Sequence, residues 1–428
     1  MSRCATNKEA WQLLFKEYNI IEEVNQKGYF KITAKDINEY REARLMTKFD
    51  NSSNLPEIFK KNKLSILPIT SNSYMIARFQ LYKKFEKIEE QEIIKINFPE
   101  YIESLDYNNI TSESLAINCA YITKILEHFL EEELVPTISG KMGSGNFEFK
   151  VNTNADKYIN VHVQNSRIEI DGGYEGINSF TLIEAKNVIS DDFIVRQLYY
   201  PYRLWKSKIN KPVRSLYIVY SNDIFNIYEY KFEHEGDYSS IKFVKSKRYS
   251  IESTQIDLQD IEKIFKNINE FIDEPKVAFP QADSFNRVIN LCELLFSGAK
   301  NKNQITENYA FDERQTNYYT DAGRYLGLIN KHKDKSNIVF TLTEEGRRIL
   351  KLKYKQRQLE LVKLILKHKV FFNYLQLYLE KLERPTVSET IQIMKKSNLY
   401  NVKKESTYIR RSSTIRGWIE WILDLTNI

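Results

Sequence analysis

The sequence has little cysteine and no long run of apolar residues. Its three cysteines, Cys4, Cys119 and Cys292, stand far apart and form no CxxC pair, which excludes a disulfide framework and a zinc ribbon. Charged residues interrupt the apolar stretches; residues 361–372, for instance, contain three lysines. A membrane-spanning helix needs ~20 consecutive apolar residues, and the first residues also lack the apolar core of a signal peptide. We therefore expect a cytoplasmic protein that does not associate with membranes.

Missing motifs exclude three further classes of enzyme. The five histidines stand alone, without the paired His and Asn of an HNH nuclease site. Residues 332–334 read His-Lys-Asp, but phospholipase-D-type nucleases need a lysine two residues after the histidine, where Asp334 stands. No Gly-x-x-x-x-Gly-Lys-Ser/Thr motif occurs, so we do not expect ATP hydrolysis through a P-loop.

The composition is that of a folded protein with several domains. Its 428 residues suit two to four domains of ~100–200 residues each, and 42% of them are hydrophobic, enough for a buried core. Residues 351–428 hold 16 Lys and Arg against 7 Asp and Glu, a net charge of +9, so the other 350 residues sum to −3. A basic C-terminal part on a near-neutral body is typical of a module that binds nucleic acid, although a solvated helical surface has the same composition.

The pattern of apolar residues and breaks along the chain predicts four domains. A helix at 8–18 and strands at 64–68 and 74–79 indicate a small mixed domain at the start. The predicted domains are an N-terminal accessory domain at 1–105, for which DNA binding is one open role, a catalytic α/β domain at 106–275, a winged-helix domain at 280–350 and a basic helical extension at 351–428.

The second domain is expected to be an α/β sandwich with a mixed sheet flanked by helices. A long amphipathic helix should end at Pro136, the turn Gly172-Gly173 should end one strand, and Pro201 should kink or end the second helix. The expected elements are a helix at 112–134, strands at 146–151, 166–171 and 179–186, a helix at 191–205, and strands at 213–220 and 226–232.

Beyond a proline-containing linker at 271–283 the chain is expected to be mainly helical. Helix, helix, helix and hairpin is the order of the winged helix-turn-helix motif. The expected elements are helices at 284–296, 303–309 and 312–328, a basic hairpin at 331–342, a closing helix at 343–350, and two short helices around a basic hinge within 387–423.

Asp171, Glu184 and Lys186 form the group that carries chemistry. Residues i and i+2 of a strand point to the same face, so Glu184 and Lys186 should project together, and Asp171 should lie alongside if the strands pair. Two carboxylates and a backbone carbonyl form a hard-oxygen site for Mg²⁺. Lys186 is then placed to orient or deprotonate the attacking water and to neutralise the phosphate. The pattern predicts metal-assisted hydrolysis of a phosphodiester.

The order of elements around these residues resembles the PD-(D/E)xK nuclease fold. The proline of that name is absent, because Ile170 precedes Asp171, as in many members of the superfamily. The resemblance implies that Gln197, in the helix after Lys186, acts near the active site, although Pro201 stands where the recombination nucleases carry a tyrosine. It also implies an acid from the first helix, for which Glu127 is one candidate among several.

Polar residues gather at the start of the helix expected at 312–328. Arginine reads guanine, and glutamine or asparagine reads adenine, while a recognition helix places such residues at its N-terminal end in the major groove. Lysines of the following hairpin suit phosphates, and the basic segment 403–421 resembles the end of another helix-turn-helix unit. The residues expected to bind DNA are Arg314, Gln315, Asn317, Tyr318, Lys331, Lys333, Lys335, Arg410 and Arg411.

Over residues 110–428 the arrangement resembles type II restriction endonucleases that join a PD-(D/E)xK domain to winged-helix specificity modules. The resemblance implies a site-specific, Mg²⁺-dependent endonuclease for double-stranded DNA in a bacterial restriction–modification system, with a cognate DNA methyltransferase in the same system. Because one catalytic centre cuts one strand, double-strand cleavage needs a homodimer or two sequential nicks, of which we favour the homodimer. Two alternatives stay open: a structure-specific repair nuclease of the same fold, and a non-catalytic winged-helix DNA-binding regulator.

Overall fold

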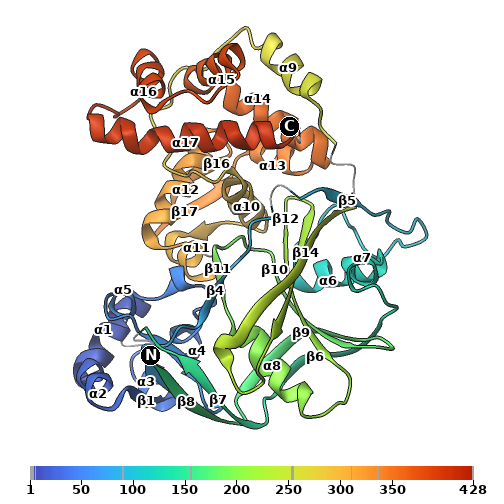
Figure 1. The fold of residues 1–428 in the computed structure, drawn as a ribbon. Helices are drawn as coiled ribbons and strands as arrows, with labels where there is room; N and C mark the ends of the chain where they lie inside the picture. The colour runs from blue at the N-terminus through green and yellow to red at the C-terminus, as the bar shows by residue number, and fades with distance from the viewer. Residues whose placement is uncertain are drawn as a thin grey trace.

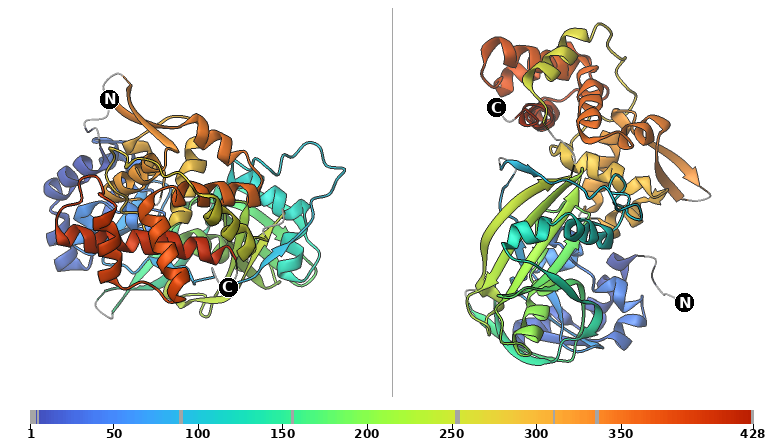
Figure 2. Two further views of the ribbon diagram at one scale, coloured as in Figure 1. Left: turned by 90° about the horizontal axis from the view of Figure 1, so that it is seen from above. Right: turned by 90° about the vertical axis from the view of Figure 1, so that its right-hand side faces the viewer.

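The computed structural model describes residues 4, 6–88, 91–154, 157–251, 255–309, 311–334 and 337–426. Figure 1 shows three parts: an N-terminal module (residues 6–86, blue), a central domain built on one large sheet (residues 93–251) and a C-terminal region of mainly helical structure (residues 255–426, yellow to red). The right-hand view of Figure 2 shows the C-terminal region stacked above the other two parts. In the described residues no helix is both long and apolar enough to cross a membrane. The predicted mixed α/β class is confirmed at this level.

The N-terminal module packs short helices around one aromatic core. Trp11, Phe15 and Phe59 meet edge to face, with ring centroids 4.8–6.1 Å apart. Its elements are α1 (Asn7–Glu17), α2 (Ile20–Lys27), β1 (Tyr29–Thr33), α3 (Ala34–Asn38), α4 (Ala43–Met46), η1 (Ser52–Asn54), α5 (Glu57–Lys61), β2 (Ser65–Pro68), β3 (Ser73–Ala77) and β4 (Tyr82–Lys84). The first three strands form an antiparallel sheet in the order β1-β3-β2.

Seven strands form the sheet of the central domain. They are β5 (Ile93–Lys95), β6 (Val135–Gly143), β9 (Arg167–Glu175), β10 (Phe180–Lys186), β12 (Val213–Ser221), β13 (Ile224–Phe232) and β14 (Ile241–Ser250), in the order β5-β14-β13-β12-β10-β9-β6. β10 pairs with β12 in parallel, as β14 does with β5, and the other neighbours are antiparallel. β5 belongs to this sheet although the sequence assigned it to the accessory domain.

Helices cover both faces of this sheet. The helices α6 (Glu113–Ile122) and α7 (Ile125–Leu130) pack on the face that carries Ile183 and Ala185 of β10. The helix α8 (Arg196–Lys206) packs on the opposite face, which carries Leu182. The core on this face also includes the hairpin of β7 (Asn146–Asn152) and β8 (Tyr158–Gln164), together with β11 (Asp192–Ile194) and η2 (Tyr238–Ser240). α8 is the crossover that makes β10 and β12 parallel.

Several predicted elements of this domain are wrong in detail. The helix expected at 112–134 is two helices, because Lys124 adopts a left-handed conformation (φ 62°) between them. Pro136 lies inside β6, a strand that the sequence did not reveal. The strand at 146–151 exists, but it pairs with β8 and stands outside the main sheet. The helix expected at 191–205 begins only at Arg196, and it continues through Pro201 to Lys206.

Gly172 and Gly173 do not turn the chain. They continue β9 and pair with Ile183 and Leu182 of β10. A Cβ on Gly173 would lie 3.2 Å from the Cβ of Ile138 and 3.3 Å from the ring of Phe180. Glycine at this position therefore lets Ile138 and Phe180 pack closely against the strand. The chain turns later, where the amide of Gly176 donates to the carbonyl oxygen of Ser179.

The C-terminal region follows the predicted order of elements closely. It holds α9 (Leu258–Asn267), α10 (Phe285–Phe296), β15 (Lys300–Asn301), α11 (Lys302–Asn308), α12 (Glu313–Tyr325), β16 (Ile329–Asp334), β17 (Asn337–Leu342), α13 (Glu344–Leu350), α14 (Tyr354–Leu366), α15 (Lys369–Lys381), α16 (Val387–Lys396) and α17 (Glu405–Asp424). Three short strands pair in the order β15-β17-β16. We call residues 285–350, from α10 to α13, the hairpin module. The last helix has 20 residues, where a short one was expected.

The predicted linker at 271–283 has neither helix nor strand, but it is not a free connection. Phe279 and Ala282 are buried in one core that is shared by the hairpin module and helices α14–α17. The indole Nε1 of Trp418 donates to the Ala282 carbonyl oxygen at 2.7 Å. The hairpin module and the helices after it therefore form one packed body.

A buried polar seam joins the central domain to the C-terminal region. The side-chain amide of Asn290, on α10, donates to the Asn187 carbonyl oxygen at 2.8 Å, and its oxygen accepts from the amide of Ile189 at 3.1 Å. Asn187 and Ile189 lie one and three residues after Lys186 along the chain. On α14, the Arg357 guanidinium donates to Asp223 Oδ2 at 2.7 Å. The seam thus ties the end of β10 to the first helix of the hairpin module.

Candidate active site

The candidate active site lies where β9 and β10 part. Their ladder ends at the pair Gly172 and Ile183. One residue further, the Asp171 carboxylate takes the place of a backbone acceptor, and its Oδ2 accepts the amide hydrogen of Ala185 at 2.9 Å. Asp171 is thereby held beside the end of β10, as the sequence predicted for paired strands.

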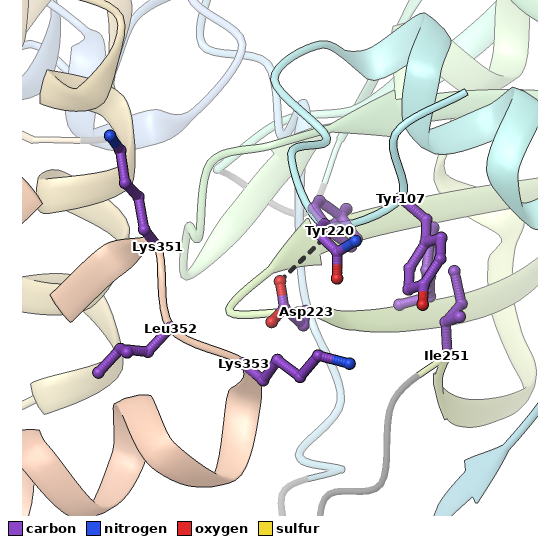
Figure 3. Close-up of a pocket in the computed structure, with 9 residues that line it drawn as sticks. Tyr107, Tyr220, Asp223, Ile251, Lys351, Leu352 and Lys353 are labelled. Carbon is purple, nitrogen blue, oxygen red and sulfur yellow. Dashed lines mark hydrogen bonds between the residues drawn. The ribbon is translucent and has the colours of Figure 1, made fainter. Parts of the chain in front are cut away.

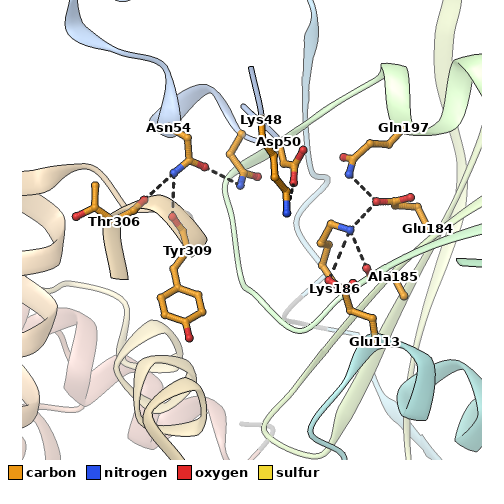
Figure 4. A network of polar contacts seen from close by, with 11 residues as sticks. Lys48, Asp50, Asn54, Glu113, Glu184, Ala185, Lys186, Gln197, Thr306 and Tyr309 are labelled. Carbon is orange, nitrogen blue, oxygen red and sulfur yellow. Dashed lines mark hydrogen bonds and ion pairs between the residues drawn. The ribbon is translucent and has the colours of Figure 1, made fainter. Parts of the chain in front are cut away.

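Glu184, Lys186 and Gln197 meet in one network (Figure 4). The Lys186 ammonium donates to Glu184 Oε1 at 2.5 Å and to the Ala185 carbonyl oxygen at 3.0 Å. Gln197, in the second position of α8, donates from Nε2 to the same Glu184 oxygen at 2.5 Å. The Glu184 side chain is only 8% exposed and that of Lys186 19%. The structure therefore brings together all four residues that the sequence proposed for catalysis.

The helical acid at this site is Glu113, and not Glu127. Glu113 opens α6, and its Oε1 lies 3.6 Å from the Lys186 ammonium. Glu127 lies on α7, where its carboxylate pairs with Lys124 at 2.9 Å and accepts from the amide of Leu134. In the sequence, Glu113 is marked only by its position directly after the helix cap Ser112. The packing of α6 on the sheet determines which acid of the helical segment lies beside Lys186.

Burial and charge shift the pKa values of this cluster. Desolvation raises the pKa of the Glu184 carboxyl to about 8; the charge of Asp171 adds to this rise and that of Lys186 opposes it. Desolvation also raises the pKa of Glu113, against the opposing charge of Lys186. The surrounding carboxylates hold the pKa of Lys186 well above its usual value, although desolvation opposes them. Three carboxyl groups thus face one ammonium; when all three are ionised they outnumber it, and a further cation would stabilise that state.

The oxygen atoms at the end of β10 are of the type that binds a hard divalent cation. The carboxylates of Asp171 and Glu184 and the carbonyl oxygen of Ala185 are all oxygen donors, which Mg²⁺ prefers. In the part of the chain that the structure describes, no group of three or more His, Cys, Asp or Glu side chains is arranged to hold a metal ion. The Lys186 ammonium contacts two of the three oxygens, so a cation on this set requires Lys186 to withdraw.

The residues predicted to read DNA lie at the start of α12 and on the hairpin. Arg314 and Asn317 are exposed on the first turns of α12, and Lys331 and Lys333 are exposed on β16. The Gln315 side chain instead caps the start of α12, where its Oε1 accepts a hydrogen bond from the backbone amide of Asp312. Lys335 lies outside the described residues.

The second basic element comes close to the same helix. Arg410 is exposed on α17, whereas Arg411 is half-buried and donates to the carbonyl oxygen of Phe279. Desolvation and the charge of Arg410 lower the pKa of Arg411, and the charges of Tyr318 and Asp321 on α12 oppose this. Arg411 of α17 and Tyr318 of α12 are therefore close enough to interact, although they are about 90 residues apart in the sequence.

Two cavities lie between the central domain and the C-terminal region. The smaller, of about 180 Å³, is lined by Tyr107, Tyr220, Asp223 and Lys351 among others (Figure 3). The larger, of about 490 Å³, reaches Asn187, next to Lys186. Neither is lined by Glu184 or Lys186, so the candidate active site is separate from both.

Three protein families match successive parts of the chain, and each is described as a domain of unknown function. They are DUF6996 over residues 8–76, DUF6997 over residues 77–250 and DUF7226 over residues 287–427. No curated protein and no solved structure matches the chain. The second match contains the whole candidate active site, and the third spans both predicted domains beyond residue 280.

Proposed function

We propose that this protein is a site-specific, Mg²⁺-dependent endonuclease that cuts double-stranded DNA in the cytoplasm as part of a restriction–modification system. The observation that carries the proposal is the buried cluster at the end of β10. There Asp171 is fixed to the amide of Ala185, and Glu184 bonds both Lys186 and Gln197. Acidic residues, a lysine two positions later and a glutamine from the next helix are what the PD-(D/E)xK resemblance calls for.

The topology around the cluster supports a PD-(D/E)xK fold. A helix, α6, precedes three antiparallel strands, β6, β9 and β10, and α8 then crosses to the parallel strand β12. This matches the element order expected for the fold, once β6 replaces the strand at 146–151 in the sheet. In the hairpin module, the three helices α10, α11 and α12 come before the β16–β17 hairpin of a three-stranded sheet, and this order supports a winged helix.

The side chains of the cluster have distinct tasks in this reaction. Mg²⁺, when bound, supplies a Lewis acid that polarises the phosphate and stabilises its developing charge. Asp171, Glu184 and the Ala185 carbonyl oxygen would hold the ion. Lys186 orients the attacking water and neutralises the phosphate. Gln197 keeps Glu184 in place through the bond from its Nε2.

Incubation of purified protein with phage DNA tests this function. With Mg²⁺ or Mn²⁺ we expect discrete fragments, and with Ca²⁺ binding without cleavage, because Ca²⁺ is larger and activates water poorly. Excess EDTA should abolish cleavage, and cutting that persists in EDTA would refute the proposal. Cleavage confined to branched or damaged DNA would instead indicate a repair nuclease, and binding without cleavage under all conditions a regulator.

Replacing Arg314 with alanine should weaken binding to the cognate site by ~1–3 kcal/mol and leave non-specific binding nearly unchanged, because an exposed arginine at the start of α12 is placed to contact base edges. The measurement is a fluorescence-anisotropy titration on cognate and scrambled duplexes in Ca²⁺. Arg324→Ala is the matched control, since Arg324 lies on the same helix and pairs with Asp321 at 2.8 Å. Equal losses on both duplexes would contradict base reading by Arg314.

The double change Lys331→Ala and Lys333→Ala should act in the opposite way. Both side chains are exposed on β16, where they suit phosphates. Their removal should weaken binding to all duplexes alike and reduce the salt slope by about one unit per lost phosphate contact. The same titrations at several salt concentrations measure this, and an unchanged slope would place the hairpin away from DNA.

A further inference from the structure

The N-terminal module reaches the candidate active site with one segment, residues 47–56. The carbonyl oxygen of Asp50 accepts the amide hydrogen of Ile194 at 2.8 Å. The amide of Ser52 donates to Asp192 Oδ1 at 2.8 Å. Asp192 and Ile194 are the first and last residues of β11. This strand begins six residues after Lys186 and pairs with β4 of the N-terminal module. The segment is thus fixed to the chain that leaves the active site.

The other end of the segment is fixed to the hairpin module. Asn54 Nδ2 donates to the carbonyl oxygens of Thr306, at 3.1 Å, and Tyr309, at 2.9 Å, at the end of α11. The N-terminal module also shares one apolar core with the sheet, to which Phe79 and Leu81 contribute. These contacts set the position of the segment between the active site and the module proposed to read DNA.

Two charged side chains of this segment lie beside the cluster. Figure 4 shows Lys48 and Asp50 between the contacts of Asn54 and the cluster of Glu184, Lys186 and Gln197. The Lys48 ammonium lies 3.8 Å from Asp50 Oδ2, and its side chain is 70% exposed while that of Asp50 is 18% exposed. The Lys48 ammonium therefore lies within ion-pair distance of Asp50 and keeps its access to solvent.

The charges of the segment act on the cluster itself. Burial raises the pKa of both carboxyl groups; the charge of Lys48 opposes that rise at Glu113, and the charge of Asp50 adds to it at Glu184. When the three carboxyl groups of the cluster are ionised, they outnumber the one ammonium and repel an approaching phosphodiester. A second, exposed cation at the entrance would offset that repulsion.

We propose that Lys48 binds a phosphate of the DNA strand in the active site, so that the N-terminal module completes the catalytic centre. Asp50 is the positioning residue that holds the Lys48 ammonium toward the cluster. The proposal rests on the nuclease function proposed above, and it adds a residue that no sequence pattern connects to Asp171, Glu184 and Lys186. It assigns the first 86 residues a direct part in cleavage.

The test compares Lys48→Ala with Lys61→Ala. Lys61 lies in the same module, its side chain is 73% exposed, and its ammonium is 4.0 Å from a Glu57 oxygen, so it matches Lys48 in exposure and in the length of its ion pair. Single-turnover cleavage of plasmid DNA with Mg²⁺ gives the rate, and anisotropy in Ca²⁺ gives the affinity. For Lys48→Ala we expect a rate on the order of 30-fold lower, less than a buried catalytic donor would cost because the site is open to solvent, with affinity within ~3-fold.

Two further measurements separate a phosphate contact from a structural role. Lys48→Arg should restore the rate to within ~3-fold, because the guanidinium also binds phosphate, and the melting temperature of Lys48→Ala should equal that of the wild type. Equal rates for Lys48→Ala and Lys61→Ala, in a protein that Glu184→Gln inactivates, would overturn the proposal and leave the nuclease function standing. A lower melting temperature without rescue by arginine would also overturn it. A wild-type protein that does not cut DNA would refute the nuclease function itself.

Discussion

Replacing Glu184 with glutamine should lower the rate of DNA cleavage by about 10³-fold, equivalent to about 4 kcal/mol of transition-state stabilisation. The change removes a carboxylate that would hold the metal ion, and it leaves Gln197 and Lys186 without the oxygen charge they now share. Asp171→Asn and Lys186→Met should have effects of similar size, through the second carboxylate and through the cation beside the attacking water. DNA affinity in Ca²⁺ should stay within ~10-fold, because the residues proposed to read DNA lie elsewhere.

The stability of these variants distinguishes lost chemistry from lost folding. Burial raises the pKa of the Glu184 carboxyl, which means that the folded protein holds its ionised form at a cost. A neutral glutamine of the same shape should therefore leave the melting temperature unchanged or higher. Glu169→Gln is the control, since Glu169 lies on the same strand as Asp171, is 61% exposed and lies 3.7 Å from Lys141. Glu184→Gln protein that cuts at the wild-type rate would refute the assignment of the site.

The site residues on one strand could be predicted because a strand has a simple period. Glu184 and Lys186 are two positions apart in a run with an apolar entry, so their shared face followed from the sequence alone. Gln197 came from the resemblance to nucleases, which places a glutamine in the next helix. The helices of the hairpin module could also be predicted, because three of them begin directly after a residue that favours the N-cap position: Ser284, Asp312 and Thr343.

Glu113 and Lys48 could not be predicted, because their place depends on long-range packing. The apolar face of residues 112–134 reads as one helix, and the left-handed Lys124 that divides it changes which acid faces the sheet. Lys48 lies more than 130 residues before Glu184. The pairing of β4 with β11 and the hydrogen bonds of Asp50 and Ser52 to β11 bring the two together. For the same reason the sequence did not predict β6 or the place of β5 in the large sheet, since the partner strands of both are distant in the sequence.

Arg357 forms a buried ion pair at the seam between the central domain and the C-terminal region. Its guanidinium donates to Asn222 Oδ1 at 3.0 Å and to Asp223 Oδ2 at 2.7 Å, and the side chain is 5% exposed. The nearby Glu293 carboxylate accepts from Ser221 and from the amide of Asn222. Desolvation raises the pKa of Glu293, and the charge of Arg357 opposes that rise. One buried cation therefore serves two carboxylates from two parts of the protein.

Arg357→Met should lower the free energy of unfolding at this seam by about 3–5 kcal/mol, because it leaves Asp223 and Glu293 without their buried cation. Hydrogen exchange of α14 and thermal unfolding measure the loss. Arg348→Met is the matched control: Arg348 also bonds two carboxylates, those of Glu345 and Glu360, but it is 49% exposed, so its removal should cost at most ~1 kcal/mol. Adding Glu293→Gln to Arg357→Met should recover part of the loss, since it removes one of the two charges left unpaired. Equal losses for the two arginine variants would show that the seam is held by its apolar contacts and not by this ion pair.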